Sequence, residues 1–403
     1  MKSFRKLKIA DTSLVLIDQV MYSGTNFLLT IFIAKNLNIA DFGIFSTVMI
    51  FTFLALSFSN ALIIQPFQVY VAKIKHKKEY YVFLTLSIII LLSAFLLLSI
   101  IPTLLIKTYN YSIFECSFFI VTYLFQDFFR KLLLGINKIK LVVAIDVFFI
   151  ILLLIWFAIS YEVLNLRIMF LIIALANLIS ATIGMIFISN NYSFPNEWKS
   201  YLKQHLIQGK WTVGVAILQW GSSNFFILIS GIYIGIEALG ALRLVQSLFG
   251  VLNILLQTIE NYFLPKIAEL YNNNKKIAEN YLFKISTQGA IIFGIILAIL
   301  FLFSSKIIVL TGGIQYEKYN YIVKFMCVLY FVIFLSYPVR IMIRIQLLNK
   351  IFFYGYLFSF LFSIVSFHFL LQNFNLTGAI LGLITNQLIM ILFWKNQLKK
   401  NNF

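Results

Sequence analysis

LVVAIDVFFIILLLIWFAIS, residues 141–160, is the stretch that decides the fold, because only Asp146 interrupts its apolar run before Ser160. At a rise of about 1.5 Å per residue, a helix of about 20 residues crosses a hydrocarbon core of about 30 Å. Comparable apolar runs occupy residues 12–34, 42–68, 80–105, 113–134, 167–189, 211–234, 238–263, 285–309, 320–343, 351–372 and 376–394. The sequence therefore predicts an all-α integral membrane protein with about twelve transmembrane helices.

The composition agrees with a chain whose main solvent is lipid. Apolar residues make up 61% and charged residues 11%, against about 45–50% and about 25% in soluble proteins. The net charge is +18, but the basic residues lie in short clusters between apolar runs, so we do not expect nucleic acid as a partner. Cys116 and Cys327 match no metal-ligand spacing, so neither a metal site nor a disulfide framework is expected.

The distribution of Lys and Arg predicts the orientation of the helices. If connections alternate between the two membrane faces, the side that holds both termini collects most of the basic residues. The other side has only six, which are Lys35, Lys107, Arg167, Lys306, Lys318 and Lys324. Because positive charge is enriched in cytoplasmic loops, both termini are predicted to be cytoplasmic.

Weak internal similarity suggests two halves. Asn26 precedes Gly43 much as Asn224 precedes Gly240, and further matches follow in the same order. A polar connection that includes Pro195 separates the halves. We expect two six-helix lobes, residues 1–195 and 196–403, and because each half has an even number of spans the repeats must run parallel, as in transporters with a central cavity.

Familiar catalytic motifs are missing from the sequence. It has no G-x-x-x-x-G-K-[ST], no H-E-x-x-H and no G-x-S-x-G, and its three histidines are scattered. The chain is therefore expected to be neither an enzyme nor a nucleotide-driven pump, and no cofactor is implied.

Four ionisable residues share a depth near the inner ends of spans in the first half. They are Asp18, Asp127, Arg130 and Asp146. A charge at membrane depth costs at least about 2.5–3.5 kcal/mol, so each needs a partner, water or an interface. One interpretation is a cation or proton site, or an inner gate of salt bridges. The other is a set of interfacial charges with one intrahelical pair.

Polar residues in the second half favour a substrate cavity. Arginine can bind phosphate oxygens through two parallel hydrogen bonds, which lysine cannot do, and this favours a cavity role for Arg243. Arg340 and Arg344, at the inner end of a span, are interpreted as cytoplasmic anchors. The candidate cavity residues are Arg243, Gln246, Gln219, Asn224, its counterpart Asn26, and Lys324.

Three segments carry a resemblance to a known family. Residues 34–46 (AKNLNIADFGIFS) resemble the opening of polysaccharide repeat-unit flippases of the O-antigen and capsule type. These belong to the multidrug, oligosaccharidyl-lipid and polysaccharide exporter (MOP) superfamily. The segment from Gly240 to Ala268 and the turn LTGGIQY at 310–316 are similar to the same family's second lobe.

The resemblance implies a transporter in the bacterial cytoplasmic membrane. Its cationic cavity would take an undecaprenyl-pyrophosphate-linked oligosaccharide from the cytoplasmic leaflet and present it externally by alternating access. The expected partners are this lipid-linked oligosaccharide, membrane lipid and the polysaccharide polymerase machinery. The first lobe departs from the pattern, because it has little positive charge at depth.

Other functions remain open at this point. An ion-coupled exporter of drugs or small amphiphiles would share the fold, and the three aspartates would suit organic cations. Peptidoglycan-precursor flipping is less favoured, because such flippases typically carry two extra spans. A membrane glycosyltransferase or polymerase ranks lower, because every external connection is short.

Overall fold

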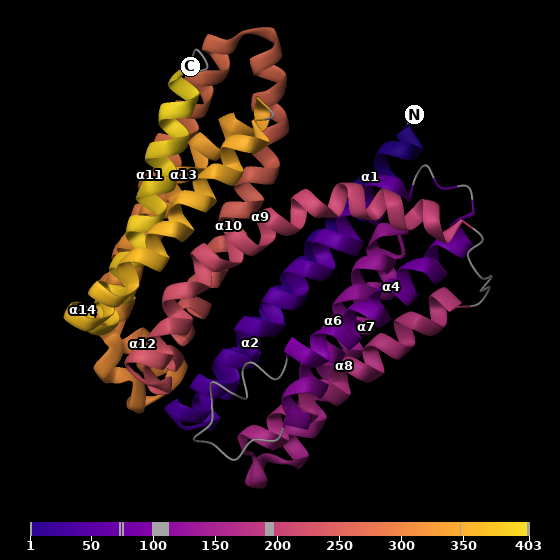
Figure 1. Cartoon of the computed structure of the whole chain (residues 1–403), viewed down its shortest axis with the longest axis horizontal. Helices are drawn as coiled ribbons and strands as arrows, with labels where there is room; N and C mark the ends of the chain where they lie inside the picture. The colour runs from indigo at the N-terminus through magenta and orange to yellow at the C-terminus, as the bar shows by residue number, and fades with distance from the viewer. Residues whose placement is uncertain are drawn as a thin grey trace. The chain divides into compact units, whose positions relative to one another are not determined.

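The computed structural model describes residues 2–71, 74, 76–98, 113–189, 197–346 and 348–400 (Figure 1), and all regular structure in these ranges is helical. The expected lobe boundary after Pro195 lies outside the described residues, as do Lys107 and the end of the expected span 80–105. The first part of the chain forms α1 (Lys2–Asn36), α2 (Ile39–Ser59), the π-helical η1 (Asn60–Ile64), α3 (Gln65–Tyr70), α4 (Lys77–Leu98), α6 (Ile113–Gly135), α7 (Ile139–Ile159), the 3-10 helix η2 (Tyr161–Val163) and α8 (Leu166–Ser189). It continues with α9 (Trp198–Tyr233), α10 (Ile236–Asn273), α11 (Lys275–Leu302), α12 (Ser304–Gly312), the 3-10 helix η3 (Ile314–Tyr319), α13 (Asn320–Ile345) and α14 (Asn349–Lys400).

Nine helical segments within the described ranges are long and apolar enough to cross a membrane. They confirm the expectation of an all-helical chain with many segments that could span a membrane. The twelve-span count and the orientation of the termini stay predictions. The described cysteines, Cys116 and Cys327, are buried and free, as their apolar surroundings in the sequence suggest.

The longest candidate segment, Lys350–Lys400, folds back on itself. Its helix α14 is interrupted at Asn375, which has φ 50° and ψ −134°. Asn386 Nδ2 donates to Ser363 Oγ at 2.8 Å, and the indole nitrogen of Trp394 donates to the carbonyl of Ile351 at 3.1 Å. Both contacts join positions on opposite sides of the break, so α14 is a pair of antiparallel helices that cover the expected spans 351–372 and 376–394.

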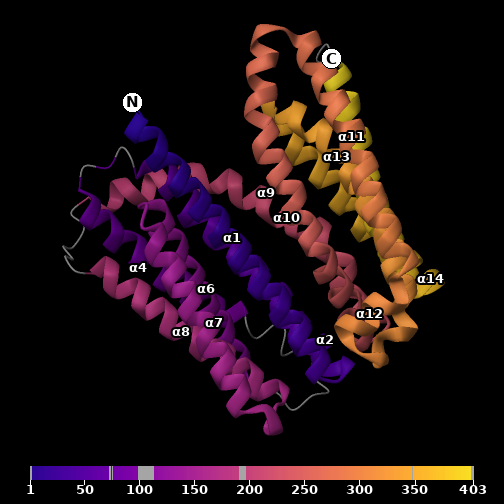
Figure 2. The same cartoon turned by 180° about the vertical axis from the view of Figure 1, so that it is seen from behind.

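The chain forms two compact units. Unit 1 comprises Met1–Leu29 and Ile44–Ile217. Within it, α6 packs against α4, α7 and α8, and these helices lie side by side in both views (Figure 1 and Figure 2). Phe45, Phe119 and Phe170 form an aromatic cluster in its core, with the rings of Phe119 and Phe170 5.2 Å apart. These rings pack α2, α6 and α8 against one another.

The first half of α9 is hydrogen-bonded to the π-helical η1 and to α4 within unit 1. The Nδ1 atom of His205 lies 2.9 Å from the carbonyl of Leu62, and Nε2 lies 2.7 Å from the hydroxyl of Tyr80. Thr212 donates to the carbonyl of Ala61 at 3.0 Å. Burial lowers the pKa of His205, which favours a neutral ring that donates through one nitrogen and accepts through the other.

Unit 2 comprises Thr30–Gly43 and Leu218–Phe403. Its α13 packs against α14, α11 and α10, and Trp394 is buried in one core cluster among these helices. At the other end of the unit, Gly43 of α2 and Gly240 of α10 meet: a Cβ on Gly240 would lie 3.1 Å from the Gly43 Cα. The two glycines matched between the halves of the sequence therefore allow two backbones to approach closely.

A methyl group at this crossing is expected to destabilise the protein. A Cβ at Gly43 would lie 2.2 Å from the carbonyl oxygen of Ile236, so Gly43→Ala forces the helices apart. We expect a loss of about 1–3 kcal/mol, visible as a lower melting temperature in detergent. The matched control is Gly250→Ala on α10, where nothing lies within 4 Å of the added Cβ. Equal melting temperatures for the two variants would contradict the tight crossing.

Candidate functional site

Three of the four ionisable residues predicted to share a depth in the first half form one buried cluster. The Nε atom of Arg130 on α6 donates to Asp146 Oδ2 of α7 at 2.9 Å, and an Nη atom donates to Asp18 of α1. The guanidinium group also lies over the ring of Tyr22, 4.0 Å from its centroid. Asp18, Arg130 and Asp146 are only 2%, 6% and 4% exposed, so these charges depend on one another rather than on water.

The fourth residue, Asp127, belongs to a separate ion pair. Its Oδ2 atom lies 2.7 Å from Lys131 Nζ, one turn along α6, and the same amine donates to Asn60 Oδ1 at 2.8 Å. The sequence allowed an intrahelical pair between Asp127 and Arg130, but Arg130 instead reaches α1 and α7. Lys131 therefore joins the charged face of α6 to the π-helical η1.

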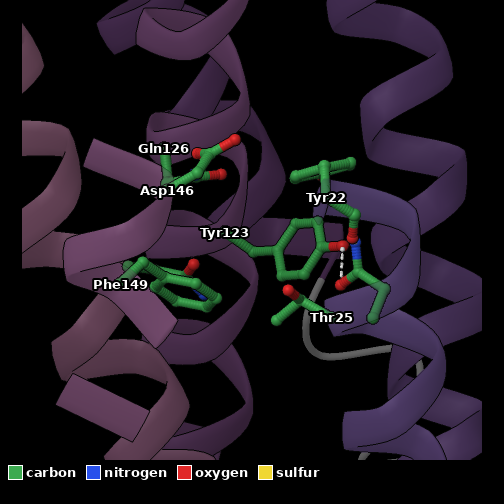
Figure 3. A pocket seen from close by; sticks show the side chains of 8 residues that line it. Tyr22, Thr25, Tyr123, Gln126, Asp146 and Phe149 are labelled. Carbon is green, nitrogen blue, oxygen red and sulfur yellow. Dashed lines mark hydrogen bonds between the residues drawn. The ribbon is translucent and has the colours of Figure 1, made fainter. Parts of the chain in front are cut away.

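A small polar pocket adjoins this cluster (Figure 3). Its lining includes Asn26, Tyr123, Gln126, Asp146 and Asn177. Tyr123 extends from α6 toward α1, where its hydroxyl donates to Asn26 Oδ1 at 3.4 Å. The pocket volume is about 10 Å³, which is room for about one water molecule. It could hold a water or a bare ion, but not an organic substrate.

Two oxygen atoms of the cluster have no hydrogen-bond partner among the described residues. Asp18 Oδ1 and Asp146 Oδ1 are both buried and unpaired. An unpaired buried acceptor costs about 1–3 kcal/mol, and more when it carries charge. The arrangement of two carboxylates on one guanidinium group thus leaves acceptor capacity for a proton, a water or a small cation.

Unit 2 contains a much larger polar pocket, which we call the cation pocket. Its volume is about 500 Å³, within the range of about 300–1,000 Å³ typical of small-molecule sites. Its charged lining residues are Glu260 of α10 with Arg340 and Arg344 of α13. In the part of the lining that the structure describes, two guanidinium groups thus face one carboxylate, which gives an excess of positive charge.

The two arginines of the cation pocket differ in their partners. Arg344 Nη1 lies 2.7 Å from Glu260 Oε1, and Glu260 is only 3% exposed. The guanidinium group of Arg340 lies over the ring of Tyr337, 4.8 Å from its centroid, and its buried Nε atom has no hydrogen-bond partner among the described residues. Arg340 therefore has donor capacity to spare inside this pocket, at its buried Nε atom.

The predicted cavity residues of the second half separate into three groups. Gln219 and Gln246 line the cation pocket, and Arg243 donates a hydrogen bond to Gln246 from one turn away on α10. Asn224 is buried and donates to the carbonyl of Trp220 at 3.0 Å. Lys324 is exposed and lies over the ring of Phe301, on another face of α13. Asn26 lies in the small pocket of unit 1.

Sequence reasoning missed the principal charges of the cation pocket. The sequence favours Arg340 and Arg344 as cytoplasmic anchors and gives no signal for Glu260. A signal was present, because Ile333, Tyr337, Arg340 and Arg344 recur at helical spacing and line one face of α13. The sequence does not say whether that face points to lipid or inward, and only the packing of α13 against its neighbours decides this.

Comparisons with known proteins place this geometry in a fold class. No family model and no curated protein matches the sequence. Among solved structures, the lipid II flippase MurJ in an inward closed conformation superposes with a TM-score of 0.71 at 13% identity, covering 97% of this chain and 87% of that one. An inward-facing multidrug resistance MATE family transporter of the MOP superfamily gives a TM-score of 0.75 at 11% identity, covering 95% of each chain.

A MOP superfamily transporter from Pyrococcus furiosus is also similar, with a TM-score of 0.60 at 14% identity and 96% coverage of each chain. Likenesses at this level of identity establish the fold alone, and this fold agrees with the superfamily resemblance drawn from the sequence. The O-antigen or capsule subtype stays a prediction. The chain has the fold of the MOP-superfamily transporters.

Proposed function

We propose that this protein is a MOP-superfamily membrane transporter that flips undecaprenyl-pyrophosphate-linked oligosaccharide from the cytoplasmic to the periplasmic or external leaflet. The observation that carries the proposal is the cation pocket, where Arg340 and Arg344 face a single carboxylate. The unpaired Nε of Arg340 offers a donor to a phosphate oxygen, and guanidinium groups bind phosphate in bidentate geometry. Gln219, Gln246 and the aromatic residues of the lining offer contacts for sugars.

The charge inventory favours an anionic substrate over an organic cation. In the unit 1 cluster, the carboxylates of Asp18 and Asp146 are both bound by Arg130, and Asp127 is bound by Lys131. The adjoining pocket has room for about one water molecule only. A drug-sized cation would therefore meet paired carboxylates and little space in unit 1, and an excess of arginine in unit 2.

The proposal includes the topology predicted from the sequence. Counting the two halves of α14 separately and adding α1 and α6 to the other candidate segments gives twelve spans. The paired charges of α6 are compatible with membrane depth, because they face partners inside unit 1. Both termini are then cytoplasmic, the two six-helix halves are residues 1–195 and 196–403, and transport proceeds by alternating access in a bacterial inner membrane.

An ion-coupled exporter of drugs or small amphiphiles is the second candidate, and one observation favours ion coupling. Asp18 and Asp146 share one arginine and each has a buried unpaired oxygen. We propose that this pair binds the coupling proton or cation, with Asp127 and Lys131 alongside. Ion coupling is compatible with a lipid-linked oligosaccharide and with a small amphiphile as substrate. A measurement of which substrate is transported therefore decides between the flippase and the exporter.

The deciding measurement is the leaflet location of the lipid-linked oligosaccharide in cells. An enzyme that reaches only the external face is applied to cells in which the gene is deleted and then restored. We expect the substrate to accumulate inside the deletion strain and to regain external access on restoration. Normal external access in the deletion strain, with every other flippase gene also removed, would reject the flippase proposal and favour small-molecule export.

A further inference from the structure

An apolar groove lies between α10, α11 and α13 in unit 2. We call it the α11 groove, and it is lined by Leu256 and Phe263 of α10, Ser286 and Ile292 of α11, and Phe334 and Pro338 of α13, among others. Its volume is about 250 Å³. Among the described residues, those that line it carry no charge, so its chemistry is opposite to that of the cation pocket. Space of this shape and polarity fits an apolar chain rather than a hydrated group.

The groove opens at a surface that suits lipid. Ile292 lines the groove and is 63% exposed, so the mouth lies at the outer face of α11. Ile291, Ile295 and Ile299 are also more than half exposed on the same helix. A continuous apolar face of this kind on a candidate membrane span contacts hydrocarbon. An apolar chain could therefore enter the groove from the membrane without crossing water.

The inner end of the groove meets the cation pocket at Tyr337. This residue lines both cavities and is 8% exposed. On α13, Phe334, Pro338 and Ile341 point into the groove, whereas Ile333, Arg340 and Arg344 point into the cation pocket. The two faces are adjacent on one helix, and the Tyr337 ring between them lies beneath the Arg340 guanidinium group. A ligand with an anionic head and an apolar tail could occupy both cavities at once.

We infer that the α11 groove binds the polyisoprenyl chain of the substrate next to its pyrophosphate, while Arg340 binds the pyrophosphate itself. This inference rests on the proposed function and adds a tail site to it. Two observations support this ligand: the Tyr337 ring at the inner end of the groove lies beneath the Arg340 guanidinium group of the neighbouring cation pocket, and an exposed apolar face of α11 lies at the mouth. The anionic pyrophosphate complements the charge of the Arg340 guanidinium group. The polyisoprenyl chain leaves the groove at its mouth, past the apolar face of α11, and enters the lipid.

The test compares two pyrophosphates that differ only in their tails. Farnesyl pyrophosphate has a longer tail than isopentenyl pyrophosphate, which places the same phosphates on one isoprene unit. Binding of each to the purified full-length protein in detergent is measured by the shift of its melting temperature across a ligand titration. We expect the wild-type protein to bind the farnesyl compound at least about tenfold more tightly, because the groove buries the added methylene groups.

Two substitutions separate the tail site from the headgroup site. Ser286→Trp fills the groove and is expected to abolish the preference for the longer tail while isopentenyl pyrophosphate still binds. Thr287→Trp is the matched control, because Thr287 is exposed and does not line the groove, and it should keep the preference. Arg340→Ala should weaken both ligands about equally.

The outcomes distinguish the tail site from the proposed function. A Ser286→Trp protein that keeps the wild-type preference would overturn the groove assignment and leave the headgroup site standing. Failure of wild-type protein to bind either pyrophosphate would overturn both proposals. If Ser286→Trp does not fold, Ile292→Trp replaces it, because this position lies at the exposed mouth and can accommodate a larger apolar side chain.

Discussion

Replacing Arg130 with Met is expected to destabilise the protein by about 3–5 kcal/mol, because it leaves buried carboxylates without their cation. Arg130 is bonded to both Asp18 and Asp146, which lie on different helices, so one substitution removes charge compensation at two places. The measurement is the melting temperature of the purified protein in detergent, followed by intrinsic fluorescence.

A combined variant separates loss of charge balance from loss of packing. Arg130→Met with Asp18→Asn and Asp146→Asn removes all three charges, and it should recover much of the stability lost in the single variant. Lys138→Met is the control, because Lys138 donates only to the exposed carbonyl of Phe187 and its loss should cost little. A single variant that melts like wild type would show that the cluster does not support unit 1.

Under the proposed function, Arg340→Ala is expected to reduce transport of lipid-linked oligosaccharide by about 10–100-fold, which corresponds to one lost hydrogen bond to a charged group. The reason is its unpaired Nε in the cation pocket. Arg340→Lys should recover only part of the activity, because a lysine keeps the charge and loses the bidentate geometry. Rates are measured by external access to the lipid-linked substrate at matched protein abundance.

Arg344→Ala provides the comparison within the same pocket. Arg344 is already paired with the buried Glu260, so its removal should lower stability more than it lowers substrate binding. Arg243→Ala, at the arginine for which the sequence favours a cavity role, should have an intermediate effect, since Arg243 donates a hydrogen bond to the pocket residue Gln246. Transport unaffected by Arg340→Ala would remove Arg340 from the site.

The sequence predicted the helices better than it predicted their faces. Apolar runs of the length of a bilayer are a local property, so most expected spans fall on helices where the structure describes them, including the antiparallel pair in α14. The expected span 285–309 instead continues past the end of α11 at Leu302 into α12. The shared depth of Asp18, Arg130 and Asp146 also follows from counting residues along three spans. Their mutual contact needs the rotation of each helix about its axis, which depends on packing across helices.

The cation pocket shows where such reasoning ends. Arg340 and Arg344 lie at the inner end of a span, a position where cytoplasmic anchors and cavity cations look the same in sequence. Glu260 lies on α10, far along the chain from its partner Arg344. Lys324 and Arg340 are both on α13, yet one is exposed and the other lines the pocket. Only tertiary contacts distinguish these cases.

The crossing of Gly43 and Gly240 bears on how such a chain can diverge. At that point the helices meet through backbone atoms, with the Ile236 carbonyl against one glycine and the Ile39 carbonyl against the other. A contact of this kind constrains the size of two residues and almost nothing about the side chains around them. Lineages could therefore replace most lipid-facing residues by drift while keeping the architecture, which fits a shared fold at 11–14% identity.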